Sequence, residues 1–457
     1  MGNCDWIKKG SRIVITTRDK SLTEGLTVSD HYEVPGLNER EGLELFKAQI
    51  GTTLEGNYLE LSRKYVDYTG GNPLALEAFG EEIRGKDEDH WEARLRTLSK
   101  VSSEKIGKVL RTCFDGLNQK QKDAFLDIAI FFRSKDEDYI KSLLESFDPD
   151  TSKAGNNFRE LLDKFLIGVS DGRVEMNNLL LTMAMELVEA SGGKYLLLPS
   201  DSAGSNTDAL KNKEGKYKVR GIILDMSNME EKPLDNQAFV SMSSLLYLKV
   251  YYSLCSMHSK AGCKLNLPDG IYFPKDSILR YLDWMRFPRK ELPSDFEPMN
   301  LIDLRLPYSK IKCVAPKLKW VDLSHSSELT SISSLSDVPN LLRLNLEGCT
   351  SLKELPEEMK KMKKLVFLNL RGCTSLLSLP NITLDSLKTH SQWLLKAPDI
   401  RKSLETLYLN GTAIDGLPPA IGNLHRLNFL NLKDCVSLAT LPDCLGKLKS
   451  LQELKLS

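Results

Sequence analysis

The chain has 457 residues, roughly three times the length of an ordinary domain, so we expect several domains. Hydrophobic residues make up 41% and charged residues 27%, which excludes a mainly disordered chain. Lys plus Arg and Asp plus Glu number 62 each, so no basic excess predicts nucleic-acid binding. No apolar run approaches the about 18 residues of a membrane span. Nine cysteines without a CxxC pair predict reduced thiols, as in a cytoplasmic or nuclear protein.

Residues 1–35 contain one strand-like segment. Gly10–Asp19 is apolar and β-branched in its middle and polar at its end, which predicts a buried parallel strand. Such a strand needs neighbours on both sides, and the residues before it are too few to supply a strand and its crossover. Either another chain supplies the neighbour, or this segment is the end of a longer α/β domain that is truncated here. We favour truncation.

Residues 36–118 show helical periodicity with clear end signals. Asn38 is an expected N-cap, with Glu41 three positions later. A second helix is expected to stop at Gly70, and Pro73 is suited to the first position of the next. We expect five helices in this small helical domain: one after Asn38, one at 58–68, one from residue 73, one at 90–98 and one at 106–114.

Residues 119–198 combine helices with a hairpin. Helices are expected at 121–132, 139–147 and 158–165. Asp171-Gly172 lies between two short extended runs and predicts a tight hairpin turn. Helices followed by a hairpin favour a winged-helix domain. Its candidate recognition helix mixes basic with acidic residues, so we expect a structural or regulatory role and no nucleic-acid partner.

Residues 199–240 are interpreted as a linker and the entry to a repeat domain at 241–457. Leu341-x-x-Leu344-x-Leu346-x-x-Cys349 recurs around Leu368 and Leu430, and the central leucines 344 and 368 are 24 residues apart. This pattern and period are typical of leucine-rich repeats, whose short strands stack their leucines into one core. We therefore expect a curved solenoid. The expected strand centres are Leu248, Leu282, Leu304, Val321, Leu344, Leu368, Leu407, Leu430 and Leu454.

Three cysteines occupy one position of the repeat. Cys349, Cys373 and Cys435 could form a metal or redox ladder, or they could fill the buried turn of each coil and bond to the backbone. We favour the buried turn. The stretch 384–402 departs from the pattern and is interpreted as one damaged coil.

Four segments, in chain order, resemble motifs of plant intracellular disease-resistance proteins of the TIR-type NB-ARC leucine-rich-repeat family. They are Gly10–Arg18, Gly70–Leu76, Phe125–Phe132 and Val174–Leu180, and the repeats follow them. The resemblance implies a multidomain α/β protein. It would contain a residual NB-ARC strand within 1–35, a helical ARC1-like domain at 36–118, a winged-helix ARC2-like domain at 119–198, and the solenoid. In that family, the first parts form a switch that holds ADP at rest and ATP when active.

The same resemblance gives roles to residues near a nucleotide. Arg18 matches the arginine that senses the γ-phosphate at a strand end, and Thr16 and Thr17 match its hydroxyl-bearing neighbours. Pro73 and Leu74 match the turn that packs against the adenine ring. These residues would therefore line an ADP or ATP site.

A sixth residue matches with a substitution. Met176-Asn177-Asn178 matches a Met-His-Asp motif whose histidine contacts the β-phosphate of ADP. Asn177 stands in the place of that histidine. An asparagine can donate a hydrogen bond but cannot carry a positive charge, so we expect a weaker resting-state contact.

Three parts of the family's nucleotide machinery have no counterpart in this sequence. There is no G-x-x-x-x-G-K-[ST] phosphate loop, no apolar run that ends in Asp-Asp before residue 18, and no TIR domain. Phosphate affinity comes mostly from the missing parts. We therefore expect no catalytic residue, no metal site and no hydrolysis by this chain, and the absence of a phosphate loop argues against ADP binding.

The favoured interpretation is a fragment of an innate-immune receptor that acts through protein contacts of its repeats. Its partner would be a pathogen effector, a host protein or its own switch domain. One alternative is an intact ADP- or ATP-dependent signalling NTPase whose phosphate loop lies upstream of this chain. Another is a degenerate paralogue without function.

Overall fold

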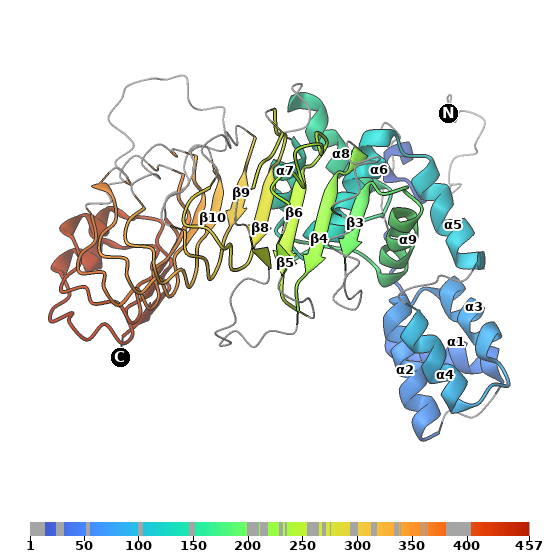
Figure 1. The fold of residues 1–457 in the computed structure, drawn as a ribbon. Coiled ribbons are helices and arrows are strands. Elements are labelled where there is room, and N and C mark those ends of the chain that lie inside the picture. The colour runs from blue at the N-terminus through green and yellow to red at the C-terminus, as the bar shows by residue number, and fades with distance from the viewer. Residues whose placement is uncertain are drawn as a thin grey trace, which may run out of the picture. The chain divides into compact units, whose positions relative to one another are not determined.

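The computed structural model shows a helical region followed by a β-solenoid (Figure 1). The chain divides into two compact units, Met1–Gly192 and Gly193–Ser457, which are described in turn. The structure describes residues 14–23, 32–51, 55–98, 104–145, 151–198, 210, 218–227, 232–233, 235–253, 265–266, 271–274, 276–292, 300–311, 318–332, 338, 340–357, 359, 362, 364–380 and 404–456.

The helical domain predicted near the N-terminus is present. Asn38 and Glu41 form the predicted capping box: the Asn38 side chain accepts from the Glu41 N–H, and the Glu41 carboxylate accepts from the Asn38 N–H. Aromatic and aliphatic side chains such as Phe46, Tyr65 and Trp91 form a buried core between the helices. The helices are α1 (Glu39–Ile50), α2 (Asn57–Thr69), α3 (Pro73–Ile83), α4 (Glu88–Thr97) and α5 (Glu104–Asp115).

The winged-helix pattern also forms. Strands β1 (Gly168–Ser170) and β2 (Arg173–Glu175) pair antiparallel, and their turn residues Asp171 and Gly172 have φ of 50° and 71°. Two left-handed residues are what a tight hairpin turn requires, so the Asp-Gly prediction is confirmed. The remaining elements are α6 (Gln119–Asp127), the π-helical turn η2 (Ile128–Phe132), α7 (Glu137–Glu145), α8 (Thr151–Asp163) and α9 (Asn178–Glu189).

The strand predicted at Gly10–Asp19 does not form over residues 14–19. These residues form neither helix nor strand, and a 3-10 turn, η1 (Lys20–Thr23), follows them. A strand is stable only when a neighbour satisfies its N–H and C=O groups, and the described residues place no second strand beside this segment. The rest of the predicted strand, 10–13, lies outside the described residues.

The second unit contains an eleven-stranded parallel sheet whose strands follow one another in chain order. All nine predicted strand centres pair in register, from Leu248 to Leu454, which confirms the repeat assignment. The strands are β3 (Tyr195–Leu198), β4 (Gly221–Asp225), β6 (Tyr247–Tyr251), β8 (Tyr281–Trp284), β9 (Asp303–Arg305), β10 (Trp320–Asp322), β11 (Arg343–Asn345), β12 (Phe367–Asn369), β13 (Thr406–Tyr408), β14 (Phe429–Asn431) and β15 (Glu453–Lys455).

The sheet begins earlier than the expected boundary at residue 241. Strand β3 was assigned to the winged-helix domain, and β4 was assigned to the linker, yet both pair in the solenoid sheet. Strand β4 carries the repeat pattern with other aliphatic residues, Val219-x-x-Ile222-x-Leu224, and all three are buried. Strand β3 lacks the pattern but is a short apolar run that pairs in register with β4. The finer domain boundaries at 35 and 118 stay predictions.

Smaller elements complete the solenoid. The short strands β5 (Lys232–Pro233) and β7 (Leu265–Asn266) pair with each other, and 3-10 turns η6 (Pro419–Asn423) and η7 (Asp443–Lys447) lie after β13 and β14. The coil interpreted as damaged, 384–402, lies outside the described residues.

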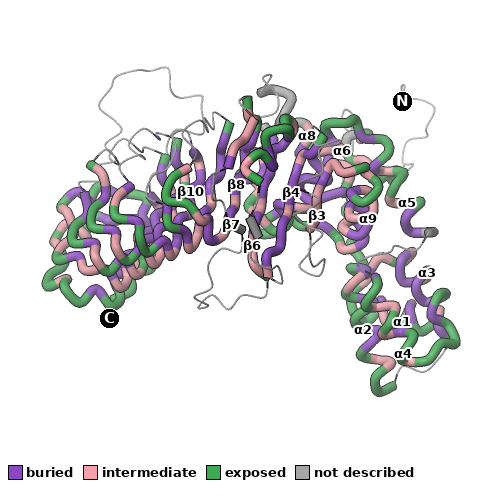
Figure 2. The backbone as a smooth tube through the Cα atoms, viewed as in Figure 1, coloured by how far each residue is buried: buried purple, intermediate pink, exposed green. Residues whose placement is uncertain are grey.

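From β6 to β14, the central residue of each strand and the residue two positions later face the solenoid core. Leu344, Leu346, Leu368 and Leu370 are all 0% exposed, and the equivalent residues of the other coils in this range join the same cluster. On β15 the equivalent residues Leu454 and Leu456 are 39% and 51% exposed. Figure 2 shows this as buried residues that recur along successive strands. Each fully buried leucine contributes about 1.5–3 kcal/mol before chain entropy is counted, so the stack supplies what a single coil cannot.

The cysteine column occupies the buried turn that we favoured. The Cys349 thiol donates to the Leu323 carbonyl at 3.2 Å, and Cys373 donates to the Leu346 carbonyl at 3.2 Å. Cys435 makes the same contact two coils further along, with the Leu409 carbonyl at 3.1 Å. Burial raises the pKa of Cys373 to about 12, so its thiol stays protonated and available as a donor. No group of His, Cys, Asp and Glu within the described ranges is arranged to hold a metal ion.

From β8 to β14, each coil turns through a left-handed residue just before the cysteine position. The residues are Arg286, Tyr308, His325, Gly348, Gly372, Gly411 and Asp434, with φ between 58° and 70°. Non-glycine residues here cost roughly 1–2 kcal/mol each. The bulky ones stack on one another: the Arg286 guanidinium lies 5.8 Å from the Tyr308 ring centre, and the Tyr308 and His325 rings are 4.6 Å apart and nearly parallel. These contacts offset part of the backbone cost.

Candidate functional site

The turn that joins α2 to α3 is held by close backbone contacts. Gly70 and Gly71 have φ of 60° and 69°, and a Cβ on Gly71 would lie 2.0 Å from the Leu37 carbonyl oxygen. Asn72 then caps α3, because its side chain accepts from the Ala75 N–H at 3.1 Å. Pro73 and Leu74 therefore open α3 directly after a turn that only glycines can form.

Asn177 reaches this turn from the start of α9. Its Nδ2 donates to the Thr69 carbonyl at 3.3 Å, and its Oδ1 accepts from the Leu179 N–H at 2.8 Å as the cap of α9. A Cβ on Gly70 would lie 2.8 Å from Asn177 Nδ2. The structure thus brings Asn177 to the turn that leads into Pro73 and Leu74.

A second polar contact joins α9 to the helical domain. The Tyr68 hydroxyl lies 2.6 Å from the Thr182 Oγ1 and donates to the Leu98 carbonyl at 2.7 Å. The Thr182 hydroxyl reaches the same carbonyl at 3.3 Å. Leu179 is 3% exposed and belongs to the helical-domain core. Helix α9 is therefore fastened to the helical domain by both apolar and polar contacts.

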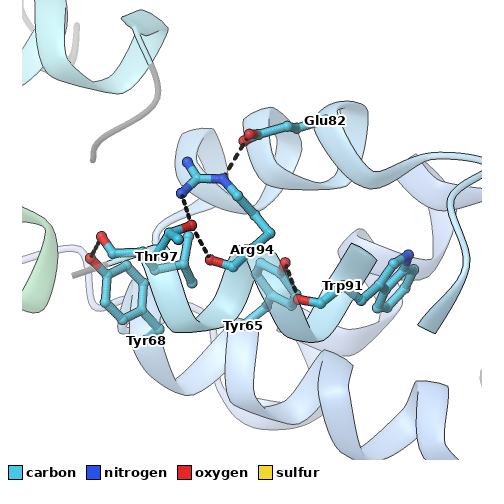
Figure 3. A network of polar contacts seen from close by, with 7 residues as sticks. Tyr65, Tyr68, Glu82, Trp91, Arg94 and Thr97 are labelled. Carbon is cyan, nitrogen blue, oxygen red and sulfur yellow. Dashed lines mark hydrogen bonds and ion pairs between the residues drawn. The ribbon is translucent and has the colours of Figure 1, made fainter. Parts of the chain in front are cut away.

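Figure 3 shows the neighbouring polar network of the helical domain. Arg94 donates to Glu82 at 2.7 Å and to the Thr97 hydroxyl at 3.2 Å, while Tyr65 donates to the Trp91 carbonyl at 3.2 Å. Burial raises the pKa of Tyr65, so its phenol stays a donor at neutral pH. The network fixes α2 and α4 and holds Tyr68 in place. Sequence reasoning missed Tyr68 and Thr182, since neither lies in a recognisable motif.

Thr16, Thr17 and Arg18 lie in a different place. All three are exposed, and the Thr17 hydroxyl bonds only locally, to the Asp19 backbone at 3.0 Å. The Asp19 carboxylate pairs with Lys164 at the end of α8, and η1 packs against α8. In Figure 1, η1 lies near α8 and away from α3.

The six residues with predicted nucleotide roles therefore form two groups. Pro73, Leu74 and Asn177 gather at the glycine turn, whereas Thr16, Thr17 and Arg18 lie beside α8. The Asn177 amide is already engaged with two backbone groups. The described residues thus do not converge into one cradle for a phosphate chain, and the nucleotide roles stay predictions.

Two basic residues, one in the C-terminal half of α8 and one directly after it, are ion-paired. Arg159 lies 3.7 Å from Asp163, and Lys164 pairs with Asp19. The structural or regulatory role expected for this helix stays a prediction.

The solenoid sheet presents its second face away from the leucine core. The residues directly before and after each central leucine point there, because side chains alternate along a strand. We call this surface the open face. It carries aromatic, charged and amide side chains, and on β12 to β14 its aromatic residues Phe367, Tyr408 and Phe429 are half-buried.

The part of the open face formed by β8 to β10 is rich in carboxylates. Asp303 accepts two bonds from Arg305, at 2.9 and 2.8 Å, and Asp283 accepts from the Tyr281 hydroxyl at 2.8 Å. Burial raises the pKa of Asp283, although Arg305 and the Tyr281 hydroxyl oppose this. Each of these bonds lies within one strand, and the Arg305 guanidinium on β9 lies 5.7 Å from the Tyr281 ring centre on β8.

No family model matches the chain. Curated relatives do. The Arabidopsis thaliana disease resistance protein RPS4 is 45% identical over 479 residues, which cover 99% of this chain and 39% of the relative. Disease resistance protein LAZ5 and disease resistance-like protein CSA1, from the same plant, are 45% and 44% identical, and each covers 96% of this chain.

The chain belongs to the plant disease resistance proteins. The chain spans about 39% of the length of RPS4. Among solved structures it is similar to the leucine-rich repeat domain of the type III effector XopL, at 18% identity and a TM-score of 0.33, over 78% of this chain and 96% of that one. Another similar structure is Listeria monocytogenes InlP, at 17% identity and a TM-score of 0.34, over 52% of this chain and 62% of that one. No helix in the described part of the protein has the length and apolar character needed to cross a membrane.

Proposed function

We propose that this chain is the recognition portion of a plant defence receptor and that it works through protein contacts on the open face of its solenoid. The observation that carries the proposal is the exposure of aromatic side chains there: Phe367, Tyr408 and Phe429 are half-buried on a face opposite the leucine core. Aromatic residues gathered on an accessible face mark protein-interaction surfaces. The partner would be a pathogen effector, a host protein or the receptor's own switch domain.

Site-specific photo-crosslinking tests this proposal. A benzoylphenylalanine at Tyr408, on the open face, is compared with one at Val436, which is 92% exposed in the turn after Cys435. We expect a discrete protein adduct from the Tyr408 position in plant cells and none from Val436. Equal adducts from both positions, or none from Tyr408, would contradict recognition by this face.

We further propose that the first unit is the distal part of a nucleotide switch and that this chain by itself neither hydrolyses nucleotide nor binds ADP at micromolar concentration. The separation of Arg18 from Asn177 and the missing phosphate loop support this. Titration of the purified chain with ADP by calorimetry is the measurement. A micromolar dissociation constant would favour the alternative of an ADP- or ATP-dependent signalling NTPase. The free thiols support a cytoplasmic or nuclear location.

A further inference from the structure

The C-terminal part of the open face carries a cluster of three aromatic rings. Phe367 and Tyr408 have ring centres 5.9 Å apart, and Tyr408 and Phe429 have ring centres 4.8 Å apart. We call these three residues the aromatic cluster. They come from three consecutive strands, β12, β13 and β14, so the cluster is fixed by the sheet itself.

A small side chain lies in the middle of the aromatic cluster. Register places Thr406 directly between Phe367 and Phe429, with Tyr408 two positions further along its own strand and on the same face. A short residue among three rings leaves room for an incoming apolar side chain to touch all three. A side chain that is fully desolvated at the centre of an interface contributes most of the binding energy, and we call the incoming side chain the anchor.

Cations stand at both ends of the aromatic cluster. The Arg343 guanidinium on β11 lies 4.2 Å from the Phe367 ring centre, and the Lys455 ammonium on β15 lies 5.4 Å from the Phe429 ring centre. Four strand spacings separate β11 from β15, or about 19 Å, which about six residues of extended chain would span. A partner segment with acidic groups on both sides of an apolar residue would match this arrangement.

The open face around the aromatic cluster also has a net positive charge. From β11 to β15, the open-face positions before, after and three after the central leucine carry four cations and two carboxylates. Both carboxylates are engaged: Glu347 lies 3.6 Å from Arg371, and Glu453 lies 3.1 Å from Lys455. The same positions from β8 to β10 carry three carboxylates and one arginine. An acidic partner is therefore attracted to the C-terminal part of the face and repelled by the part before it.

We propose that the aromatic cluster and its flanking cations bind a short acidic protein segment with a central aromatic or large aliphatic side chain. This inference rests on the proposed function and adds the chemistry of the partner. The anchor would pack over Thr406, and carboxylates on either side of it would meet Arg343 and Lys455.

The test uses the full chain and a fluorescein-labelled nine-residue peptide. The peptide has a central tryptophan, then one serine and two glutamates on each side, and glycine ends. One control peptide replaces all glutamates by lysine, and another replaces the tryptophan by alanine. We expect measurable anisotropy binding of the first peptide, weakening as salt is raised, and at least about tenfold weaker binding of either control.

Protein variants locate the binding. Tyr408→Ala should weaken binding about tenfold or more, and so should the double reversal Arg343→Glu/Lys455→Glu, which alters exposed side chains and should leave the fold intact by circular dichroism. The matched control Lys447→Glu/Lys449→Glu makes the same charge change on and after η7, outside the sheet, and should bind as the parent does.

Several results would overturn the inference: equal affinity for the lysine peptide, unchanged binding in both open-face variants, or a loss in the η7 control. Dimerisation of the chain that Tyr408→Ala abolishes would assign the face to a second copy and would also overturn it. If crosslinking from Tyr408 succeeds while the acidic peptide fails, only the partner chemistry is wrong. If both fail, recognition by the open face is wrong as well.

Discussion

Replacing Gly348 by alanine tests how the left-handed turns of the solenoid are built. Gly348 has φ of 69°, and a Cβ added to it would lie 2.4 Å from the Nδ1 atom of His325 and 3.0 Å from its Cε1. The His325 ring is stacked on Tyr308, so it cannot move without losing that contact. Gly348→Ala therefore has both a backbone cost and a packing cost.

The extra destabilisation expected for Gly348→Ala is estimated by comparing Gly348 with Gly372. The left-handed backbone costs an alanine roughly 1–2 kcal/mol at either position. Gly372 has φ of 68°, but its nearest neighbour to an added Cβ is 3.8 Å away, which is ordinary contact. Overpacking against His325 adds about 1–3 kcal/mol at Gly348 alone. We expect Gly348→Ala to destabilise the solenoid by this amount more than Gly372→Ala does.

Urea unfolding followed by circular dichroism, with hydrogen exchange of peptides from the coil around β10 and β11, measures the difference. Because coils of a solenoid can open locally, hydrogen exchange should place the loss near His325. Adding His325→Ala to Gly348→Ala should recover part of the lost stability, because the ring that obstructs the new Cβ is then absent. Equal destabilisation by the two glycine variants would refute the argument, and so would a double variant less stable than Gly348→Ala.

Three further substitutions probe other contacts. Tyr68→Phe removes the hydroxyl that donates to the Leu98 carbonyl. It should lower the free energy of unfolding of the first unit by about 1 kcal/mol in urea, and an unchanged free energy would contradict this. Asn177→Asp keeps the cap of α9 but replaces the donor to the Thr69 carbonyl by an acceptor; it should increase hydrogen exchange at the end of α2, and unchanged exchange would count against this contact. Burial opposes ionisation of Asp225, yet hydrogen bonds from two serines hold its pKa below the usual 3.8. Its stabilisation is therefore present above pH 3.8 and lost as the pH falls through the lower folded pKa, so Asp225→Asn should flatten acid unfolding curves below pH 3.8.

The repeat register could be predicted because one physical requirement fixes it. A leucine at the wrong position would point to the open face, so the spacing of Leu344, Leu368 and Leu430 determines which strands pair and where. The same logic placed Val321 correctly despite a short coil. The Asn38 cap and the Asp171 turn could also be predicted, because each depends only on neighbours within a few residues.

The rest depends on contacts that are distant in sequence. Residues 14–19 have strand-like composition, but a strand needs a partner that composition does not supply. Strand β3 lacks the leucine pattern, and its place in the solenoid follows from its pairing with β4. Asn177 was named for its motif, but its contact with Thr69, 108 residues earlier, follows only from the packing of α9. The nucleotide roles of the six predicted residues stay predictions.

Helix α9 belongs to the winged-helix segment by sequence but packs on both sides of the expected boundary at residue 118. Leu179 fills the core formed by α1 to α5, while α9 also contacts α6 and η2. A recombinant fragment that ends at residue 118 would thus lose Leu179 from that core and the Thr182 hydroxyl from the Leu98 carbonyl. Exchange of gene segments between related receptors would preserve folding only if the crossover kept residues 36–118 and α9 from the same parent.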